Sequence, residues 1–150
     1  MNNNSWGQAT WAFLHTLSVK IKPEHFNLNK NNLIELVKSI CFLLPCEDCS
    51  HHAFILLSNY NYSKIKTLKD FQIWIWEFHN IINLKLNKPE KPFTFIHNYK
   101  QNNLHTLLKF WNTKFYLAVT TPYLLKRSTE IRVLRMKVND FINNNSYLFL

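Results

Sequence analysis

Apolar residues recur along most of this chain every three or four positions, a spacing that places them on one face of an α-helix. Within the first 90 residues the pattern is clear over 5–18, 29–44, 45–56 and 67–86. Four amphipathic helices in so short a segment can bury their apolar faces by packing against one another. The pattern therefore predicts an all-α fold built on a compact antiparallel four-helix bundle.

Several residues at the ends of these stretches are typical of helix boundaries. Pro45 suits the first position of the third helix, because proline lacks the N–H that would go unpaired there. Thr67 and Asp70 form a capping arrangement that opens the fourth helix. Pro89 and Pro92 are expected to close that helix, since proline cannot continue it.

Residues 98–150 form a basic tail with two further helical stretches, 104–119 and 123–141. The tail holds eight Lys and Arg residues against two acids and so carries most of the formal charge of +9. Its apolar side chains favour packing over a freely moving tail. They are Leu107, Leu108, Trp111 and Phe115.

Composition excludes several classes of protein. Gly7 is the single glycine, whereas P-loops and dinucleotide-binding turns need several glycines at fixed spacing, so any nucleotide must be held by side chains and helix surfaces. The apolar run Ile40–Leu44 is far shorter than the roughly 20 residues of a membrane-spanning helix. The N-terminal MNNNSWGQ has no basic segment followed by an apolar one. We expect no membrane span, no signal peptide and a cytoplasmic location.

The central chemical feature is Cys46-Glu47-Asp48-Cys49 at the predicted start of a helix. Two thiols three residues apart can close an exchangeable disulfide, and the positive end of the helix dipole stabilises a thiolate there. Glu47 and Asp48 act in the opposite direction. A C-x-x-C of this kind indicates redox chemistry or metal binding, and a structural or accidental pair is a third interpretation.

Two functions of other classes stay open at this point. One is a zinc-binding module using Cys46, Cys49, Cys41 and either His51 or His52, although zinc usually takes its ligands from two separated pairs. Cys41 itself falls on the apolar pattern, where a buried free cysteine is the expected state. The other is a nucleic-acid-binding helical protein that uses aromatic residues of the basic tail. These are Trp111, Phe115 and Tyr116.

A row of polar residues lies on one face of the fourth predicted helix. His79, Asn80 and Asn83 are three or four residues apart and so face the same side. Lys85 and Lys88 add positive charge at the end of the row. The row suits a planar heterocycle with a pyrophosphate tail, and a solvated helix face is the alternative.

Trp11 and His15 share a face of the first helix and can stack on, or hydrogen-bond to, an aromatic ligand. The alternative is a core tryptophan beside a core histidine whose hydrogen bonds are satisfied.

Three sequence segments occur in order along the chain: W-G-x-x-T-W-x-x-L-H-T-L, P-C-x-x-C and F-x-x-W-x-x-x-x-H-N-x-x-N-x-K-L-x-K-P. With these segments the chain resembles the Erv/ALR family of FAD-linked sulfhydryl oxidases over residues 5–95. It looks most like the short forms carried by large DNA viruses.

The resemblance implies an oxidase domain over residues 1–97, a four-helix bundle that binds FAD and is followed by a short fifth helix. Residues 98–150 would be a basic helical extension. Cys49 would be the flavin-proximal thiol and Cys46 the interchange thiol that meets the substrate, with no metal site. The residues expected to contact FAD are Gly7, Trp11, His15, Trp76, His79, Asn80, Asn83, Lys85 and Lys88.

The implied reaction is the oxidation of protein dithiols to disulfides, with electrons passing through FAD to O₂ and giving hydrogen peroxide. The resemblance also implies a homodimer and, if the chain is viral, a place in the host cytoplasm or the virion. With Cys46 and Cys49 as the redox pair, Cys41 alone cannot form a second dithiol. Electrons must therefore enter directly at Cys46 or through a separate carrier, for which a thioredoxin-like protein is the natural candidate.

Overall fold

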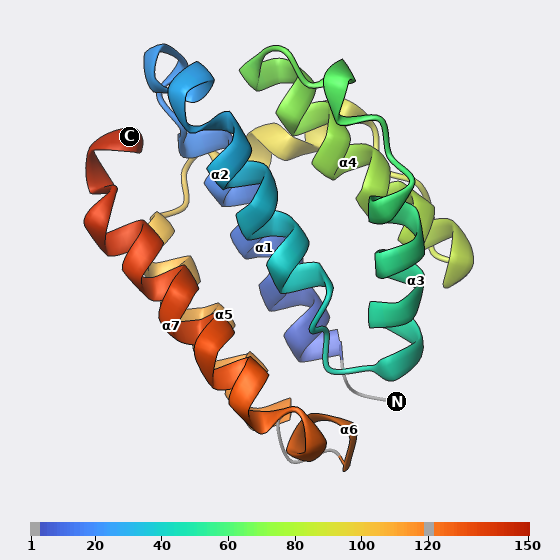
Figure 1. Ribbon diagram of the computed structural model, residues 1–150. Coiled ribbons are helices and arrows are strands. Elements are labelled where there is room, and N and C mark those ends of the chain that lie inside the picture. The colour runs from blue at the N-terminus through green and yellow to red at the C-terminus, as the bar shows by residue number, and fades with distance from the viewer. Residues whose placement is uncertain (1–3, 119–121) are drawn as a thin grey trace.

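The computed structural model describes residues 4–118 and 122–150, and every named element in these residues is a helix (Figure 1). The first four are α1 (Asn4–Lys20), α2 (Pro23–Cys41), α3 (Glu47–Ser58) and α4 (Leu68–Lys85). A short 3₁₀ turn, η1 (Tyr62–Lys64), lies between α3 and α4. The all-α class and the four-helix bundle predicted from the apolar spacing are confirmed.

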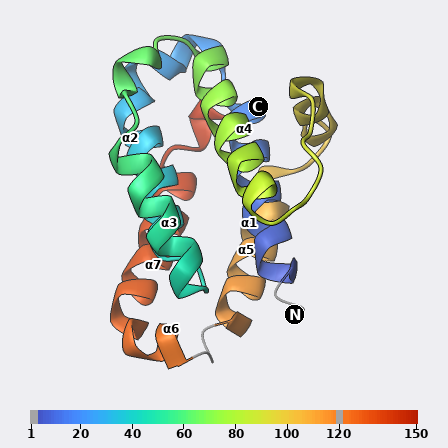
Figure 2. The ribbon, with the colours of Figure 1, turned by 90° about the vertical axis from the view of Figure 1, so that its right-hand side faces the viewer.

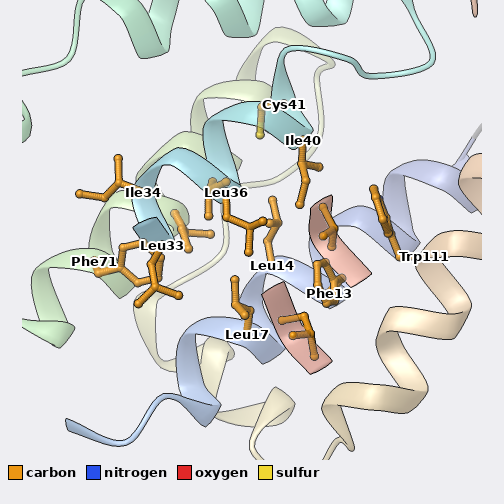
Figure 3. Close-up of a cluster of buried hydrophobic side chains, with 14 of the residues drawn as sticks. Phe13, Leu14, Leu17, Leu33, Ile34, Leu36, Ile40, Cys41, Phe71 and Trp111 are labelled. Carbon is orange, nitrogen blue, oxygen red and sulfur yellow. The ribbon is translucent and has the colours of Figure 1, made fainter. Parts of the chain in front are cut away.

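α1 runs through the middle of the molecule and is packed from several sides. Its residues Phe13, Leu14 and Leu17 are fully buried. Figure 3 shows Leu14 in one cluster with Leu36 of α2, and the rings of Phe13 and Trp111 stack with centroids 5.7 Å apart. Burying side chains of this size contributes about 1.5–3 kcal/mol each. This cluster therefore holds α1, α2 and the tail together.

The basic tail folds back along the bundle, with α5 beside α1 and α7 beside α2 (Figures 1 and 2). The stretch predicted over 104–119 is α5, whose last described residue is 118, and the stretch predicted over 123–141 corresponds to α6 and α7. The elements after α4 are η2 (Phe93–Tyr99), α5 (Leu104–Ala118), α6 (Pro122–Lys126), α7 (Ser128–Asn144) and η3 (Ser146–Leu148).

The tail is an integral part of the core. Trp111 and Phe115 are fully buried, so the predicted packing is confirmed, and the alternative that placed these two rings on a nucleic-acid-binding surface is wrong. The chain end is fixed as well, because the Leu150 N–H donates to the Lys20 carbonyl at 2.7 Å. In the two described ranges, no helix is both long enough and apolar enough to cross a membrane.

The start of α3 differs from the sequence prediction by two residues. Pro45 precedes the helix, which begins at Glu47 with Cys46 as its N-cap. The backbone of Cys46 is extended (φ −153°, ψ 119°), and its Sγ accepts a hydrogen bond from the Cys49 N–H at 3.3 Å. A sulfur atom thus takes the role that serine or aspartate oxygens usually have at this position.

The capping box predicted at the start of α4 is confirmed, whereas the end of this helix has a different cause from the one predicted. Asn87 adopts a left-handed conformation (φ 55°) before the first proline is reached. Its N–H donates to the Leu84 carbonyl, and the Lys88 N–H donates to the Asn83 carbonyl at 2.8 Å. This is the Schellman pattern, in which asparagine tolerates the left-handed residue that ends a helix.

Candidate active site

Cys46 and Cys49 are joined by a disulfide at the N-terminal end of α3. Their Cα atoms are 5.1 Å apart, within the usual range for a disulfide. Both residues are partly exposed, and Cys49 packs against the hydrophobic core. The bond is therefore accessible from outside while one of its sulfur-bearing residues borders the interior.

The environment of this disulfide contains opposing charges. The first turn of α3 presents the positive end of the helix dipole, which stabilises a thiolate formed at Cys46 or Cys49. Glu47 and Asp48 lie in the same turn and oppose a second negative charge. Both carboxylates are exposed, so solvent screens their repulsion more than it screens the dipole at the partly buried sulfurs.

Cys41 is separate from this centre. It is buried at the end of α2, as its place on the apolar pattern predicted, and burial raises its pKa to about 12. Cys41 therefore stays a neutral thiol. Across residues 4–118 and 122–150 no three His, Cys, Asp or Glu side chains converge where they could hold a metal ion. The zinc set proposed around Cys41, Cys46 and Cys49 is not assembled.

Trp11 and His15 of α1 meet His79 of α4 in an aromatic cluster. The Trp11 ring stacks on His79 with centroids 4.0 Å apart and planes 10° apart. His15 Nε2 and His79 Nδ1 are 2.9 Å apart and share a hydrogen bond. Phe95 and Tyr99 of η2 complete the cluster, each with its ring centroid 5.1 Å from that of His15. The fold thus unites residues more than 60 positions apart in the sequence.

Both histidines of the cluster are neutral near pH 7. Burial lowers the pKa of His15 to about 3, with a smaller contribution from His79. The pKa of His79 falls to about 4, first through burial and then through the nearby charges of Lys88 and Lys91. In a hydrogen bond between neutral imidazoles, one ring nitrogen donates its proton and the other accepts it.

Asn80 and Trp76 fix the segment that follows α4. The Asn80 side chain donates to the Lys91 carbonyl at 3.0 Å and accepts from the Lys91 N–H at 2.9 Å. Trp76 Nε1 donates to the same carbonyl at 2.8 Å. These contacts hold Lys91 close enough to His79 to affect its pKa. Direct contact of Asn80 and Trp76 with a cofactor stays a prediction.

The end of α4 presents a basic edge to α3. Lys85 and Lys88 are exposed, while Asn83 is buried. The pKa of His52, on α3 one turn after Cys49, is lowered by burial and then by the charge of Lys85. The end of α4 therefore lies near the disulfide-bearing helix α3 (Figure 1). Through Lys88 it also lies near His79 of the aromatic cluster.

Unpartnered polar atoms test whether this region fits the FAD implied by the resemblance. His15 Nδ1 and His52 Nδ1 are buried and have no hydrogen-bond partner among the described residues, as is also true of two core tryptophan nitrogens. Each such group costs about 1–3 kcal/mol unless a ligand or water satisfies it. Aromatic rings can stack on a planar flavin, an imidazole nitrogen can hydrogen-bond to it, and lysines attract its pyrophosphate tail. The residues fit the cofactor.

Gly7 lies within α1 one turn before Trp11, and a Cβ added to it would meet no atom of the described chain within 4 Å. Packing of the residues that the structure describes therefore gives no reason for glycine at this position. The backbone of Gly7 is thus open to a bound group, and its contact with the cofactor stays a prediction.

The sequence interpretation missed four residues of this region. Phe95 and Tyr99 belong to a 3₁₀ turn, which has no helical periodicity to identify it, and Lys91 acts through its backbone. His52 was considered only as a zinc ligand. Its spacing of three residues from Cys49 was the one signal that could have placed it beside the redox pair.

Comparison with known proteins identifies the family. The family model described as "Erv1 / Alr family" matches residues 8–103. An "FAD-linked sulfhydryl oxidase" of African swine fever virus is 28% identical over 110 residues, which cover 73% of this chain and 92% of that protein. The rice protein "FAD-linked sulfhydryl oxidase ERV1" is 31% identical over 86 residues, covering 57% and 44%. A protein of Invertebrate iridescent virus 3 is 30% identical over 87 residues, covering 57% and 58%.

No solved structure matches this chain significantly. The family assignment therefore depends on sequence, and the helical bundle and the disulfide at the start of α3 agree with it. The relatives include proteins of large DNA viruses, as the resemblance indicated. The chain belongs to the Erv1/Alr family.

Proposed function

We propose that this protein is an FAD-linked sulfhydryl oxidase, an enzyme that introduces disulfide bonds into protein dithiols. The observation that carries the proposal is the accessible Cys46–Cys49 disulfide at a helix N-terminus in a member of this family. The similar proteins of African swine fever virus and rice bear the same activity in their names.

FAD would be held beside the contact between α1 and α4, with α3 near the end of α4. Bound FAD would supply the two-electron chemistry: it would take two electrons from a thiol pair and pass them to O₂, which would be reduced to hydrogen peroxide. Trp11 and His79 offer ring faces for stacking, His15 offers an unpartnered nitrogen, and Lys85 and Lys88 offer positive charge. The further predicted contacts are Gly7, Trp76, Asn80 and Asn83.

The thiol exchange depends on the two cysteines. A substrate thiolate attacks Cys46 Sγ, the Cys46–Cys49 bond breaks, and the electron pair leaves on Cys49 as a thiolate. A second substrate thiolate then attacks the mixed disulfide, which releases Cys46 as a thiolate and the substrate as a disulfide. The packing of Cys49 against the core supports its assignment as the flavin-proximal thiol. The dipole of α3 stabilises the thiolate that leaves.

Electrons enter either directly from the substrate or through a thioredoxin-like carrier, because Cys41 is buried and alone. We propose the carrier route, together with a homodimer and with residues 1–97 as the oxidase domain. Residues 98–150 then serve as its basic extension, and their shared core with α1 and α2 supports a stabilising role.

The absorption spectrum and oxygen consumption of the purified protein test the activity. Flavin bands, O₂ uptake with dithiothreitol and an equal yield of peroxide are the expected results. A colourless protein that consumes no O₂ after incubation with FAD would contradict the proposed oxidase activity.

The carrier route has its own test. A Cys49→Ser variant keeps Cys46, whose thiolate attacks the disulfide of an oxidised carrier or client in the native cell and releases one thiolate of that partner. The mixed disulfide then persists, because the enzyme has no second thiol that could displace the partner from Cys46. One dominant dithiol carrier among the trapped proteins is the expected result. A broad set of unrelated proteins without a carrier would show direct oxidation instead.

A further inference from the structure

A groove of about 640 Å³, a volume typical of ligand sites, lies at the N-terminal end of α3. Neither cysteine lines it, but Glu47 and Asp48, the two residues between the redox cysteines, do. It is lined by Phe42 at the end of α2, by the first two turns of α3 and by Arg127 at the start of α7. Figures 1 and 2 show α6 and the start of α7 close to the N-terminal end of α3. The groove is thus formed jointly by the bundle and the C-terminal extension.

One wall of the groove is apolar and accessible. The rings of Phe42 and Phe54 are in contact, with centroids 5.4 Å apart, and Phe54 is 53% exposed. Phe54 lies two turns of helix after Cys46, on the side of α3 that faces the groove. A half-exposed phenylalanine pair in a concave surface gains free energy when an apolar side chain covers it.

The other wall is acidic. Glu47 and Asp48 line the groove and are exposed, and the ion pairs formed among the described residues involve neither of them. Arg127 is paired with Glu130, its Nη2 lying 2.5 Å from the carboxylate, so its charge is already balanced. The groove therefore carries unbalanced negative charge on a protein whose formal charge is +9.

We propose that this groove binds the cysteine-bearing segment of the protein substrate, with an apolar side chain against Phe42 and Phe54 and a lysine or arginine facing Glu47 and Asp48. The inference rests on the proposed function and adds the chemistry of the substrate to it. A cationic segment is favoured because it complements the acidic wall, and its charge attracts it to this face of an otherwise basic protein. The extension takes part by supplying the Arg127 side of the groove.

The test compares substrates and leaves the acidic wall unchanged, because Glu47 and Asp48 lie between the cysteines and alter the disulfide itself. Two dithiol peptides are used that differ only in lysine or glutamate beside the first cysteine, with dithiothreitol as a small dithiol. We expect kcat/KM to favour the lysine peptide about tenfold at low salt and the ratio to shrink at high salt. Equal kcat/KM values for the two peptides overturn the proposal.

Phe54→Ala tests the apolar wall, with Ile55→Ala as a matched control on the same helix. Ile55 is 45% exposed and lies outside the groove. Phe54→Ala is expected to lower kcat/KM for both peptides about tenfold, as loss of an apolar contact does, and to leave dithiothreitol oxidation within about twofold. Ile55→Ala is expected to change none of the three rates. An equal loss in both variants overturns the role of Phe54.

Two results separate this inference from the function on which it rests. If the wild-type protein oxidises dithiothreitol but treats both peptides and the Phe54→Ala variant alike, the groove proposal alone is wrong. If dithiothreitol is not oxidised, the oxidase function itself is wrong. A concentration-dependent dimer that Phe54→Ala dissociates in sedimentation would mean that the groove binds a second copy, and that outcome also overturns the proposal.

Discussion

Both sides of α1 carry large side chains, but one side packs against apolar partners and the other joins a cluster of aromatic and imidazole rings. On the side of α2 and α5, Phe13 and Leu17 are fully buried among apolar partners, and packing satisfies them completely. On the side of α4 and η2, Trp11 and His15 meet His79, and a buried imidazole nitrogen has no hydrogen-bond partner among the described residues.

This difference separates stability from function within one helix. Apolar packing contributes about 1.5–3 kcal/mol for each buried side chain, whereas an unsatisfied buried nitrogen costs about 1–3 kcal/mol. Trp74 and Trp111 also carry a buried ring nitrogen without a partner among the described residues, so this cost alone does not mark a ligand site. At His15 it coincides with stacked rings, and lysine charges lie near the neighbouring His79. We therefore expect changes on the first side to alter the free energy of unfolding, and changes on the second to alter cofactor retention and turnover.

The largest effect is expected at the disulfide. Cys46→Ser and Cys49→Ser should each abolish dithiol oxidation, because the one cysteine that remains cannot form the disulfide that a substrate thiolate attacks. With FAD bound, Cys46→Ser leaves a free Cys49 thiolate, and a long-wavelength charge-transfer band should appear. Cys49→Ser should lack this band. Absorption spectra at pH 8 measure the difference, and a band that requires Cys46 would reverse the two roles.

Cys41→Ala is the control for these variants. Cys41 is buried, and burial holds its pKa near 12, so it supplies no thiolate at neutral pH. Turnover per folded molecule should stay at the wild-type rate. A large loss of turnover in a folded Cys41→Ala protein would show that this thiol takes part in the reaction.

The opposite side of α1 should respond through stability alone. Trp111→Ala removes a fully buried ring that stacks on Phe13, and truncation of a core tryptophan costs about 3–5 kcal/mol. Urea unfolding measures this loss, and turnover per folded molecule should not change. Tyr116→Ala on the same helix is the control, since Tyr116 is 60% exposed and its cation–π contact with Arg135 is worth at most about 1 kcal/mol.

Much of this arrangement could be predicted from the sequence, and the exceptions have physical causes. The apolar spacing located the helices, and the motifs located Trp11, His15 and His79 because each lies on a regular helix. Phe95 and Tyr99 could not be predicted, because a 3₁₀ turn is too short to give a recognisable spacing of apolar residues.

The errors at the helix ends arose in a similar way. The N-cap of α3 was missed because a cysteine sulfur rarely takes that role, although the disulfide geometry brings it there. The end of α4 was assigned to prolines, since Asn87 shows its left-handed conformation only once the helix has formed.

The neutral histidine pair predicts a pH dependence of stability. His15 and His79 titrate near pH 6.5 when unfolded and at about 3 and 4 when folded. Between these values the unfolded chain binds more protons than the folded one. The contribution of the two histidines to stability is therefore fully present above pH 6.5 and is lost as the pH is lowered. When the pH is lowered from 7.5 to 5, each histidine should reduce the free energy of unfolding by about 2 kcal/mol. Urea unfolding of the FAD-free protein measures the loss.

His79→Gln supplies the matched comparison, because glutamine keeps a polar group but does not titrate. About half of the acid-dependent loss should disappear in this variant. A loss that stays the same would mean that groups other than His79 produce it.

Cofactor retention should depend on the polar row of α4. His79→Ala or Asn83→Ala should weaken FAD binding about 5- to 150-fold, as expected when a buried polar contact worth about 1–3 kcal/mol is lost. Helix content should be nearly unchanged. Excess FAD should restore the melting temperature, because the ligand binds only the folded state. Melting temperatures that excess FAD fails to restore would show that these two side chains are structural.

The smallest effect, and the sharpest test of the comparison, is expected at Gly7. Alanine is about 1 kcal/mol more favourable than glycine inside a helix, and a Cβ at this position meets no atom of the described residues within 4 Å. Gly7→Ala should therefore stabilise the FAD-free protein by about 0.5–1 kcal/mol. If the cofactor approaches the backbone here, the added methyl group should also weaken FAD binding, and the two effects will have opposite signs. Urea unfolding without FAD and a fluorescence titration with FAD measure them separately. Greater stability with unchanged FAD affinity would remove Gly7 from the cofactor site and leave Trp11 and His15 as the contacts that α1 provides.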